Sequence, residues 1–211
     1  MKRILWLSLL VPSLLLVSAC DASVNRSQYL ADGGRSGRMT SVNGSIHVGA
    51  RCTVGGGCRT VNGRITVGDG SRVGRLDTVN GRIRVGAGVE VDGDATTVNG
   101  PVECGAGSRV HGGVTTVNGR IELADAVVDE DLVTVNGRVL LRDGSVVRGD
   151  IVIKGRRGFF SGGRRLQVRL EGGSTVEGGI DVRDPGNEVE VYISKDSAVK
   201  GKIRNAKVIK E

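Results

Sequence analysis

Apolar and polar residues alternate in short runs, and the same arrangement of runs returns along most of the chain. In residues 60–77 the apolar side chains stand at Val61, Ile65, Val67, Val73 and Leu76, and a stretch rich in Gly, Asp and Ser separates the two runs. The alternation at 65 and 67 is typical of a strand with one buried face. Equivalent pairs recur further on, namely Ile83 and Val85, Val102 and Cys104, Ile121 and Leu123, and Val139 and Leu141. The pattern predicts two or three short strands per repeat and almost no helix.

One phrase, Thr/Ser-Val-Asn-Gly, marks every repeat. Its asparagines are Asn43, Asn62, Asn80, Asn99, Asn118 and Asn136, with successive spacings of 19, 18, 19, 19 and 18 residues. A spacing this regular predicts one structural unit per copy, stacked into a solenoid. Stacked units would place the asparagines in a ladder with about 4.8 Å per step, each amide bonding the next. Asn-Gly also favours two-residue β-hairpins, so a meander of hairpins is the alternative, but a meander does not require connections of equal length.

The C-terminal part continues the repeat in altered form. Residues 152–155 read as a worn seventh copy, and residues 168–180 match residues 191–203 at a constant offset of 23. We expect a protruding turn at 183–187 to lengthen these last coils. The fold class predicted is all-β, a single-domain β-solenoid of about nine coils with an 18–19 residue repeat and a length of about 40 Å.

The N-terminus has the features of an export signal. Lys2 and Arg3 precede an apolar run over residues 4–17 that is too short to span a bilayer comfortably. The run closes with Leu-Val-Ser-Ala-Cys at 16–20, which resembles a bacterial lipobox, although an ordinary signal peptide with an incidental cysteine is the alternative. The resemblance implies removal of residues 1–19 and lipidation of Cys20, so that acyl chains hold the protein on a membrane. We therefore expect a signal peptide at 1–19, a lipidated polar tether at 20–37 and a solenoid at 38–211, located in the cell envelope and facing the periplasm or the exterior.

The composition limits both the kind of core that the chain can form and the kinds of partner that it can bind. The chain has 35 glycines and 2% aromatic residues, so its core must consist of aliphatic stacks. Its formal net charge is +7, which favours anionic partners. Nucleic acid is a poor candidate because the chain carries an export signal.

Arginine recurs at one position of the repeat, directly after Asn-Gly. The four residues concerned are Arg64, Arg82, Arg120 and Arg138. Stacking brings their guanidinium groups close together, which is unfavourable unless carboxylates or bound anions lie between them. One interpretation is an anion-binding stripe for an anionic glycan or lipid headgroup, and the other is a row of solvated charges. A second basic cluster surrounds Phe159 and Phe160 and consists of Arg156, Arg157, Arg164 and Arg165.

The remaining candidate chemistry is sparse. Cys52 and Cys58 flank a glycine-rich stretch, which predicts a local disulfide in an oxidising compartment; metal binding is the alternative. Cys104 aligns with core valines and should be buried. His47 and His111 occupy unrelated positions, and we interpret the acidic residues Asp125, Asp129, Glu130 and Asp131 as an exposed turn. The sequence thus predicts no enzymatic activity, no metal and no cofactor.

Two phrases carry resemblances to known families. Thr-Val-Asn-Gly-Arg-Ile resembles the β-strand repeats of adhesin-type bacterial proteins of unknown function, over residues 40–155. Gly-Ser-x-Val-x-Gly-x-Ile is similar to a phrase of bactofilins, over residues 166–205, and this resemblance implies a right-handed β-helix that forms polymers. Bactofilins are typically cytoplasmic, and the export signal departs from them in this respect. We expect a non-enzymatic envelope lipoprotein that serves as a structural or adhesive scaffold and can self-associate. The alternative is a monomeric binder of anionic glycan or lipid through the arginine stripe.

Overall fold

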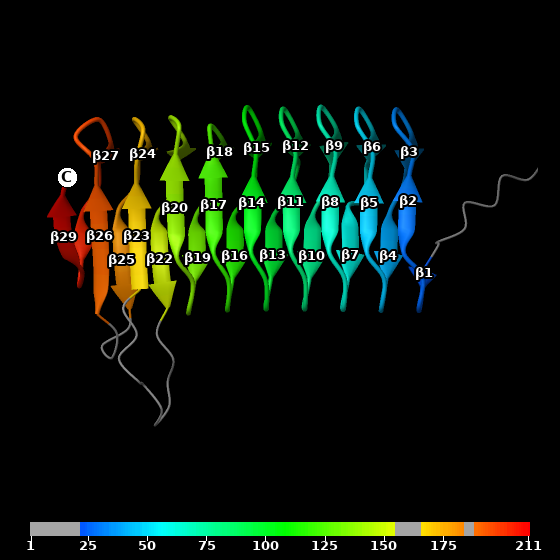
Figure 1. Ribbon diagram of the computed structural model, residues 1–211, viewed down its shortest axis with the longest axis horizontal. Coiled ribbons are helices and arrows are strands. Elements are labelled where there is room, and N and C mark those ends of the chain that lie inside the picture. The colour runs from blue at the N-terminus through cyan, green and yellow to red at the C-terminus, as the bar shows by residue number, and fades with distance from the viewer. Residues whose placement is uncertain (1–21, 155–165, 184–187) are drawn as a thin grey trace, which may run out of the picture.

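The computed structural model describes residues 22–154, 166–183 and 188–211. These residues form 29 short strands and no helix, and the strands assemble into three parallel sheets that run the length of the molecule (Figure 1). Each turn contributes one strand to each sheet, and about nine turns stack on one another. The predicted β-solenoid is confirmed. Ten stacked strands span about 43 Å at the usual spacing between neighbouring strands.

Sheet A contains the strands that precede the Asn-Gly corners. In order along the stack, its strands are β1 (Ala22–Ser23), β4 (Met39–Ser41), β7 (Cys58–Thr60), β10 (Leu76–Thr78), β13 (Ala95–Thr97), β16 (Val114–Thr116), β19 (Leu132–Thr134), β22 (Ile151–Lys154), β25 (Ile180–Arg183) and β28 (Ile203–Arg204).

Sheet B contains the strands that follow those corners. Its strands are β2 (Gln28–Leu30), β5 (Ile46–Val48), β8 (Ile65–Val67), β11 (Ile83–Val85), β14 (Val102–Cys104), β17 (Ile121–Ala124), β20 (Val139–Arg142), β23 (Leu166–Leu170), β26 (Val189–Ile193) and β29 (Lys207–Lys210).

Sheet C completes each turn with a strand of two residues. Its strands are β3 (Arg35–Ser36), β6 (Thr53–Val54), β9 (Arg72–Val73), β12 (Glu90–Val91), β15 (Arg109–Val110), β18 (Val127–Val128), β21 (Val146–Val147), β24 (Thr175–Val176) and β27 (Ala198–Val199).

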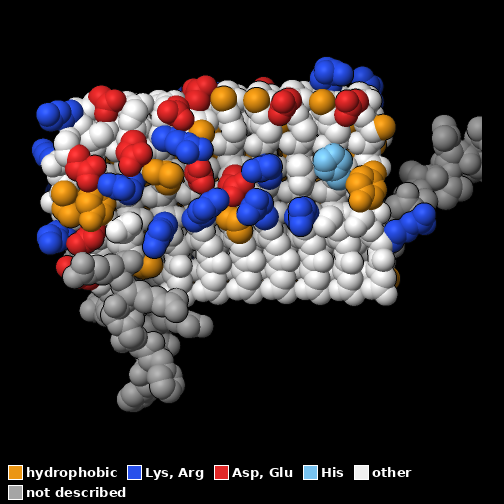
Figure 2. All heavy atoms as spheres, viewed as in Figure 1, with side chains coloured by type: hydrophobic (Ala, Val, Ile, Leu, Met, Phe, Trp, Pro, Cys, Tyr) orange, Lys and Arg blue, Asp and Glu red, His pale blue; other side chains and the backbone are white. Residues whose placement is uncertain are grey.

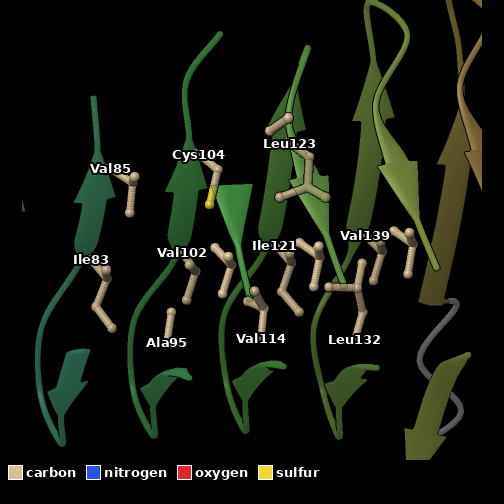
Figure 3. Packing of buried hydrophobic residues seen from close by; sticks show 14 of the residues in the cluster. Ile83, Val85, Ala95, Val102, Cys104, Val114, Ile121, Leu123, Leu132 and Val139 are labelled. Atoms are coloured by element: carbon tan, nitrogen blue, oxygen red, sulfur yellow. The ribbon is translucent and has the colours of Figure 1, made fainter. Parts of the chain in front are cut away.

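The core is a set of aliphatic columns that run along the stack. In sheet B the pair Ile83 and Val85 lies directly above Ile65 and Val67 and below Val102 and Cys104, and all six side chains are buried. Columns from sheets A and C face these, as in the packing of Ala95, Val114 and Leu132 against sheet B (Figure 3). Because the register is constant, each apolar position of the repeat contributes one column.

The hairpin alternative is wrong. Every strand pairing is parallel, and the strands on either side of an Asn-Gly corner belong to different sheets. In the part of the chain that the structure describes, the glycines with positive φ are found at other positions, most of them in the corner between sheets B and C. The Asn-Gly glycines therefore do not form the left-handed turn that a hairpin needs.

The solenoid begins earlier than predicted. Residues 22–36, which we expected to be part of a tether, form the first turn, and β1 pairs with β4 at Ala22↔Thr40. The reason is a degenerate copy of the repeat at residues 23–26, in which Arg26 replaces the glycine. Its Asn25 stands 18 residues before Asn43 and accepts a hydrogen bond from the amide of Asn43 at 2.8 Å. The boundary at residue 38 is therefore wrong, and it moves to residue 22.

The seventh copy is present as β22, and the wider offset of the last turns appears as pairings such as Val168↔Val191. Of the turn predicted at 183–187, the structure describes only Arg183. The described residues contain no helix of the length and apolar character needed to cross a lipid bilayer.

Candidate functional site

The Thr-Val-Asn-Gly corner joins sheets A and B, and its threonine is bonded internally. Thr60 Oγ1 donates a hydrogen bond of 2.8 Å to the carbonyl of Gly44 in the preceding turn, and Thr97 donates one of 3.0 Å to Gly81. The same bond recurs at Ser41, Thr78 and Thr116. A buried hydroxyl that bonds a backbone carbonyl satisfies both groups, so threonine is compatible with the apolar core at this position.

The asparagines form one continuous ladder, as their spacing predicts. Each Nδ2 donates to the Oδ1 of the asparagine one turn earlier, at distances between 2.7 and 2.9 Å. The ladder extends one step beyond the predicted set, because Asn43 donates to Asn25. These amides bond one another along the surface of the corner and stabilise the stack.

The glycine after each asparagine is required by close packing between turns. A Cβ atom built on Gly81 would lie 1.9 Å from the carbonyl oxygen of Gly63, and one built on Gly119 would lie 1.9 Å from that of Gly100. No side chain fits at these distances, so the corner tolerates only glycine. The repeated phrase is thus explained by contacts between turns, without a ligand.

The valine of the phrase points outward. Val42, Val61 and Val79 are 41%, 38% and 39% exposed, and Val98, Val117 and Val135 are half-buried in the same row. Together with the asparagine ladder they form an uncharged corner, which we define by Val42, Val61, Val79, Val98, Val117, Val135 and the adjoining asparagines and glycines. In Figure 2 the lower edge of the rod, to the right of the grey atoms, is a band without acidic or basic side chains, next to the charged face of sheet B.

The predicted arginine row lies beside this corner, and carboxylates lie between its members. Glu103, at the outward position of β14, has three arginines around it. Its Oε1 lies 3.0 Å from Arg120 and 3.7 Å from Arg82, and its Oε2 lies 3.3 Å from Arg84. Burial raises the pKa of Glu103, but the hydrogen bond from Arg120 and the three positive charges outweigh burial and hold its pKa below the ordinary value.

Glu122, one turn further along the stack, also lies between two arginines. It pairs with Arg120 at 3.3 Å and with Arg142 at 2.7 Å. Within the described residues, Arg64 and Arg138 form no ion pair, and both side chains are exposed. The arginine row is therefore a network of alternating charges in its middle, with an unpaired arginine toward each end. The sequence did not suggest Glu103 or Glu122 as partners, although both stand at the outward position of the Ile-x-Val pair, one turn from an arginine.

A second charge cluster lies on sheet C around Asp129. Arg109 bonds both carboxylate oxygens at 2.9 Å, and Arg148 Nη1 lies 2.9 Å from Oδ1. His111 Nδ1 lies 3.0 Å from Oδ2. Burial raises the pKa of Asp129, but the hydrogen bonds from Arg109 and His111 and the nearby arginines hold it below the ordinary value. Asp129 is thus part of an ion-pair network, and the expectation that it belongs to a simple exposed turn is wrong.

One group on this face has the composition of a metal site. Glu90, Asp92 and His111 each place a ligand atom within 4.8 Å of the others. Arg72 already pairs with both carboxylates, at 2.7 Å to Glu90 and 2.8 Å to Asp92. A cation would have to displace this guanidinium group, so the arrangement favours an ion-pair network over a metal centre. His47 lies elsewhere, on β5 beside Tyr29.

The predicted disulfide between Cys52 and Cys58 is absent, and both cysteines are buried free thiols. Cys58 opens β7 and points into the core in the column of Met39 and Leu76. Cys52 precedes β6, and its Sγ donates to the carbonyl of Ala31 at 3.0 Å. Both side chains lie in the hydrophobic core, Cys52 just ahead of the strand of sheet C and Cys58 at the start of the strand of sheet A. Cys104 is buried in the core, as predicted, and burial raises the pKa of Cys58 and of Cys104 to about 12.

Two of the predicted sites lie outside the described residues. They are the lipidation site Cys20 and the cluster of Arg156, Arg157, Arg164 and Arg165 around Phe159 and Phe160.

Comparison with known proteins adds no identification, because no family model, curated protein or solved structure matches the chain.

Proposed function

We propose that the chain is a non-enzymatic envelope lipoprotein, held on a membrane through Cys20, whose β-solenoid serves as a rigid structural or adhesive scaffold. The observation that supports this proposal best is that the repeated residues serve to join one turn to the next. The asparagine of each copy bonds the preceding turn and the glycine packs against it, and the threonine or serine bonds it in every copy except at Thr134. Side chains committed to joining turns give a stiff rod, which suits a scaffold better than a catalyst.

The surface of the rod also suggests how copies would adhere. The first turn, residues 22–38, has three arginines and one aspartate, and the last, residues 195–211, has six basic and two acidic residues. Stacking one end on the other brings like charges together, which opposes growth into filaments through the ends. The uncharged corner carries no charge that would oppose pairing, and it offers a row of six valines, of which Val42, Val61 and Val79 are exposed. Self-association of this scaffold therefore proceeds side by side through the uncharged corner.

Sedimentation velocity and negative-stain electron microscopy of residues 21–211 at low and moderate salt test this proposal. All the described strands lie within residues 21–211. We expect short rods that pair laterally as concentration rises, and a Val61→Lys, Val79→Lys variant that stays monomeric. The matched control is Thr53→Lys, Thr66→Lys, which adds the same charge at outward positions of β6 and β8 and should still pair. Rods that remain monomeric at all concentrations would contradict the adhesive part of the proposal.

Anchoring is tested separately. Changing Cys20→Ser should release the protein from the membrane fraction in which the unchanged chain is found. Recovery of both forms in the same membrane fraction, each without added lipid by mass spectrometry, would refute lipidation.

A second candidate function is binding of an anionic glycan through the arginine row. It is supported by Arg64 and Arg138, which are exposed and form no ion pair within the described residues. Binding of this kind should weaken as salt rises and should be lost in an Arg64→Glu, Arg138→Glu variant. Arg82 and Arg120, which already pair with Glu103, should contribute less.

A further inference from the structure

Positive charge is concentrated in the two end turns of the rod, and it is greatest at the C-terminal end. Residues 39–154, which form the long central part of the solenoid, contain 13 basic and 13 acidic residues and have no net charge. The last turn departs from this balance, because residues 195–211 contain six basic and only two acidic residues. We call the six basic residues the cationic ring; they are Lys195, Lys200, Lys202, Arg204, Lys207 and Lys210.

The members of the cationic ring are exposed and mostly unpaired. Lys200 forms an ion pair with Glu177 at 3.0 Å. The other five form no ion pair with any carboxylate that the structure describes. On the central turns, in contrast, arginines such as Arg59 and Arg84 pair with a carboxylate of a neighbouring turn. Unpaired charges at one place create a local field that attracts anions.

The cationic ring surrounds the open end of the solenoid. Lys200 follows β27 of sheet C, Arg204 ends β28 of sheet A, and Lys207 and Lys210 bound β29 of sheet B. The remaining two lie in the connections between sheets. These strands are the last in each sheet, at the opposite extreme of the rod from β1 (Figure 1). All three sides of the terminal turn therefore carry positive charge.

We propose that the cationic ring docks the C-terminal end of the rod on an anionic lipid surface. Five of the six residues are lysines, whose compact charges on flexible stems suit the headgroups of a membrane plane. Val208, between two of these lysines, is 42% exposed and adds apolar surface at the same edge. A second copy is a poorer occupant, since the first turn is also basic. A linear glycan is poorer too, because the charges encircle the end and do not form a row.

Vesicle co-sedimentation of residues 21–211, which lack Cys20 and so cannot be acylated, tests the docking. We expect binding to vesicles of phosphatidylcholine with phosphatidylglycerol, none to phosphatidylcholine alone, and weaker binding as salt rises. Each lysine removed should lower the partition coefficient about fivefold. The Lys202→Gln, Lys207→Gln, Lys210→Gln variant should therefore bind about a hundredfold more weakly than the unchanged protein.

The matched control is Arg59→Gln, Arg72→Gln, Arg84→Gln, which changes the net charge equally but alters paired arginines of the central turns. It should bind almost as well as the unchanged protein, and circular dichroism should show that both variants are folded. An equal loss in the control would overturn the proposal, because diffuse charge would then explain the binding. Binding to dextran sulfate without binding to the anionic vesicles would also overturn it, in favour of a soluble polyanion.

Discussion

Replacement of one corner glycine by alanine should destabilise the whole solenoid. In Gly119→Ala, the new Cβ would lie 1.9 Å from the carbonyl oxygen of Gly100, and Thr116 Oγ1 is only 2.9 Å away. Cβ atoms are not found within 3.0 Å of such an atom, so the backbone of one turn must move by about an ångström against its neighbour. Overpacking of this kind costs about 3 kcal/mol when backbone cannot give way.

For a domain of this size, 1 kcal/mol corresponds to a shift in Tm of about 2–4 °C, so Gly119→Ala should lower Tm by about 6–12 °C. Gly55→Ala is the matched control, because its Cβ would meet no atom within 4 Å and its φ is not in the left-handed region. There the loss of chain entropy in the unfolded state should leave stability unchanged or raise it by up to about 1 kcal/mol. Thermal unfolding followed by far-ultraviolet circular dichroism measures both. Equal Tm values for the two variants would refute the argument that the corner is closed to any side chain.

Three further outcomes follow from the contacts between turns. Asn99→Ala removes two ladder bonds and Asn136→Ala removes one, so chemical denaturation should show a loss of about 2 kcal/mol for the first and about half of that for the second; equal losses would contradict the ladder. The pKa of Glu103 in the folded protein is below its ordinary value of 4.5. The stability that the Glu103 carboxylate contributes is therefore present above pH 4.5 and is lost as pH falls through the folded pKa. Glu103→Gln should flatten the decline in Tm below about pH 4.5. The raised pKa of Cys58 and of Cys104 should leave both thiols unmodified by iodoacetamide at pH 8 until the protein is unfolded, and mass spectrometry of native protein that shows rapid alkylation would contradict their burial.

The solenoid could be predicted from the sequence because its main determinant is periodic. A constant spacing between Asn-Gly phrases specifies the register, and the register places Ile65, Ile83 and Val102 in one column. The first turn escaped prediction because Arg26 replaces the glycine that identifies a copy. In that turn the ladder to Asn25 is kept, although the phrase is no longer recognisable.

The partners of the charged residues could be predicted less well. The spacing of the arginines showed that carboxylates or anions must separate them, but the identity of Glu103 depends on which outward positions the stack brings together. Cys52 and Cys58 are close in sequence, but each is a buried free thiol, and Cys52 Sγ donates to the carbonyl of Ala31. Short sequence separation was a misleading signal there, because Cys52 precedes a strand of sheet C and Cys58 opens the following strand, which belongs to sheet A.

The bonds of the Thr-Val-Asn-Gly corner reach back by one turn and no further. Thr97 bonds Gly81, and Asn99 bonds Asn80, at sequence separations within one residue of those in the copies before and after. A duplication of one 19-residue segment could therefore be inserted between two turns without loss of any existing bond, and it would lengthen the rod by about 4.8 Å. The length of such a rod can therefore change in fixed steps of one turn, through addition or deletion of copies of a single coding unit.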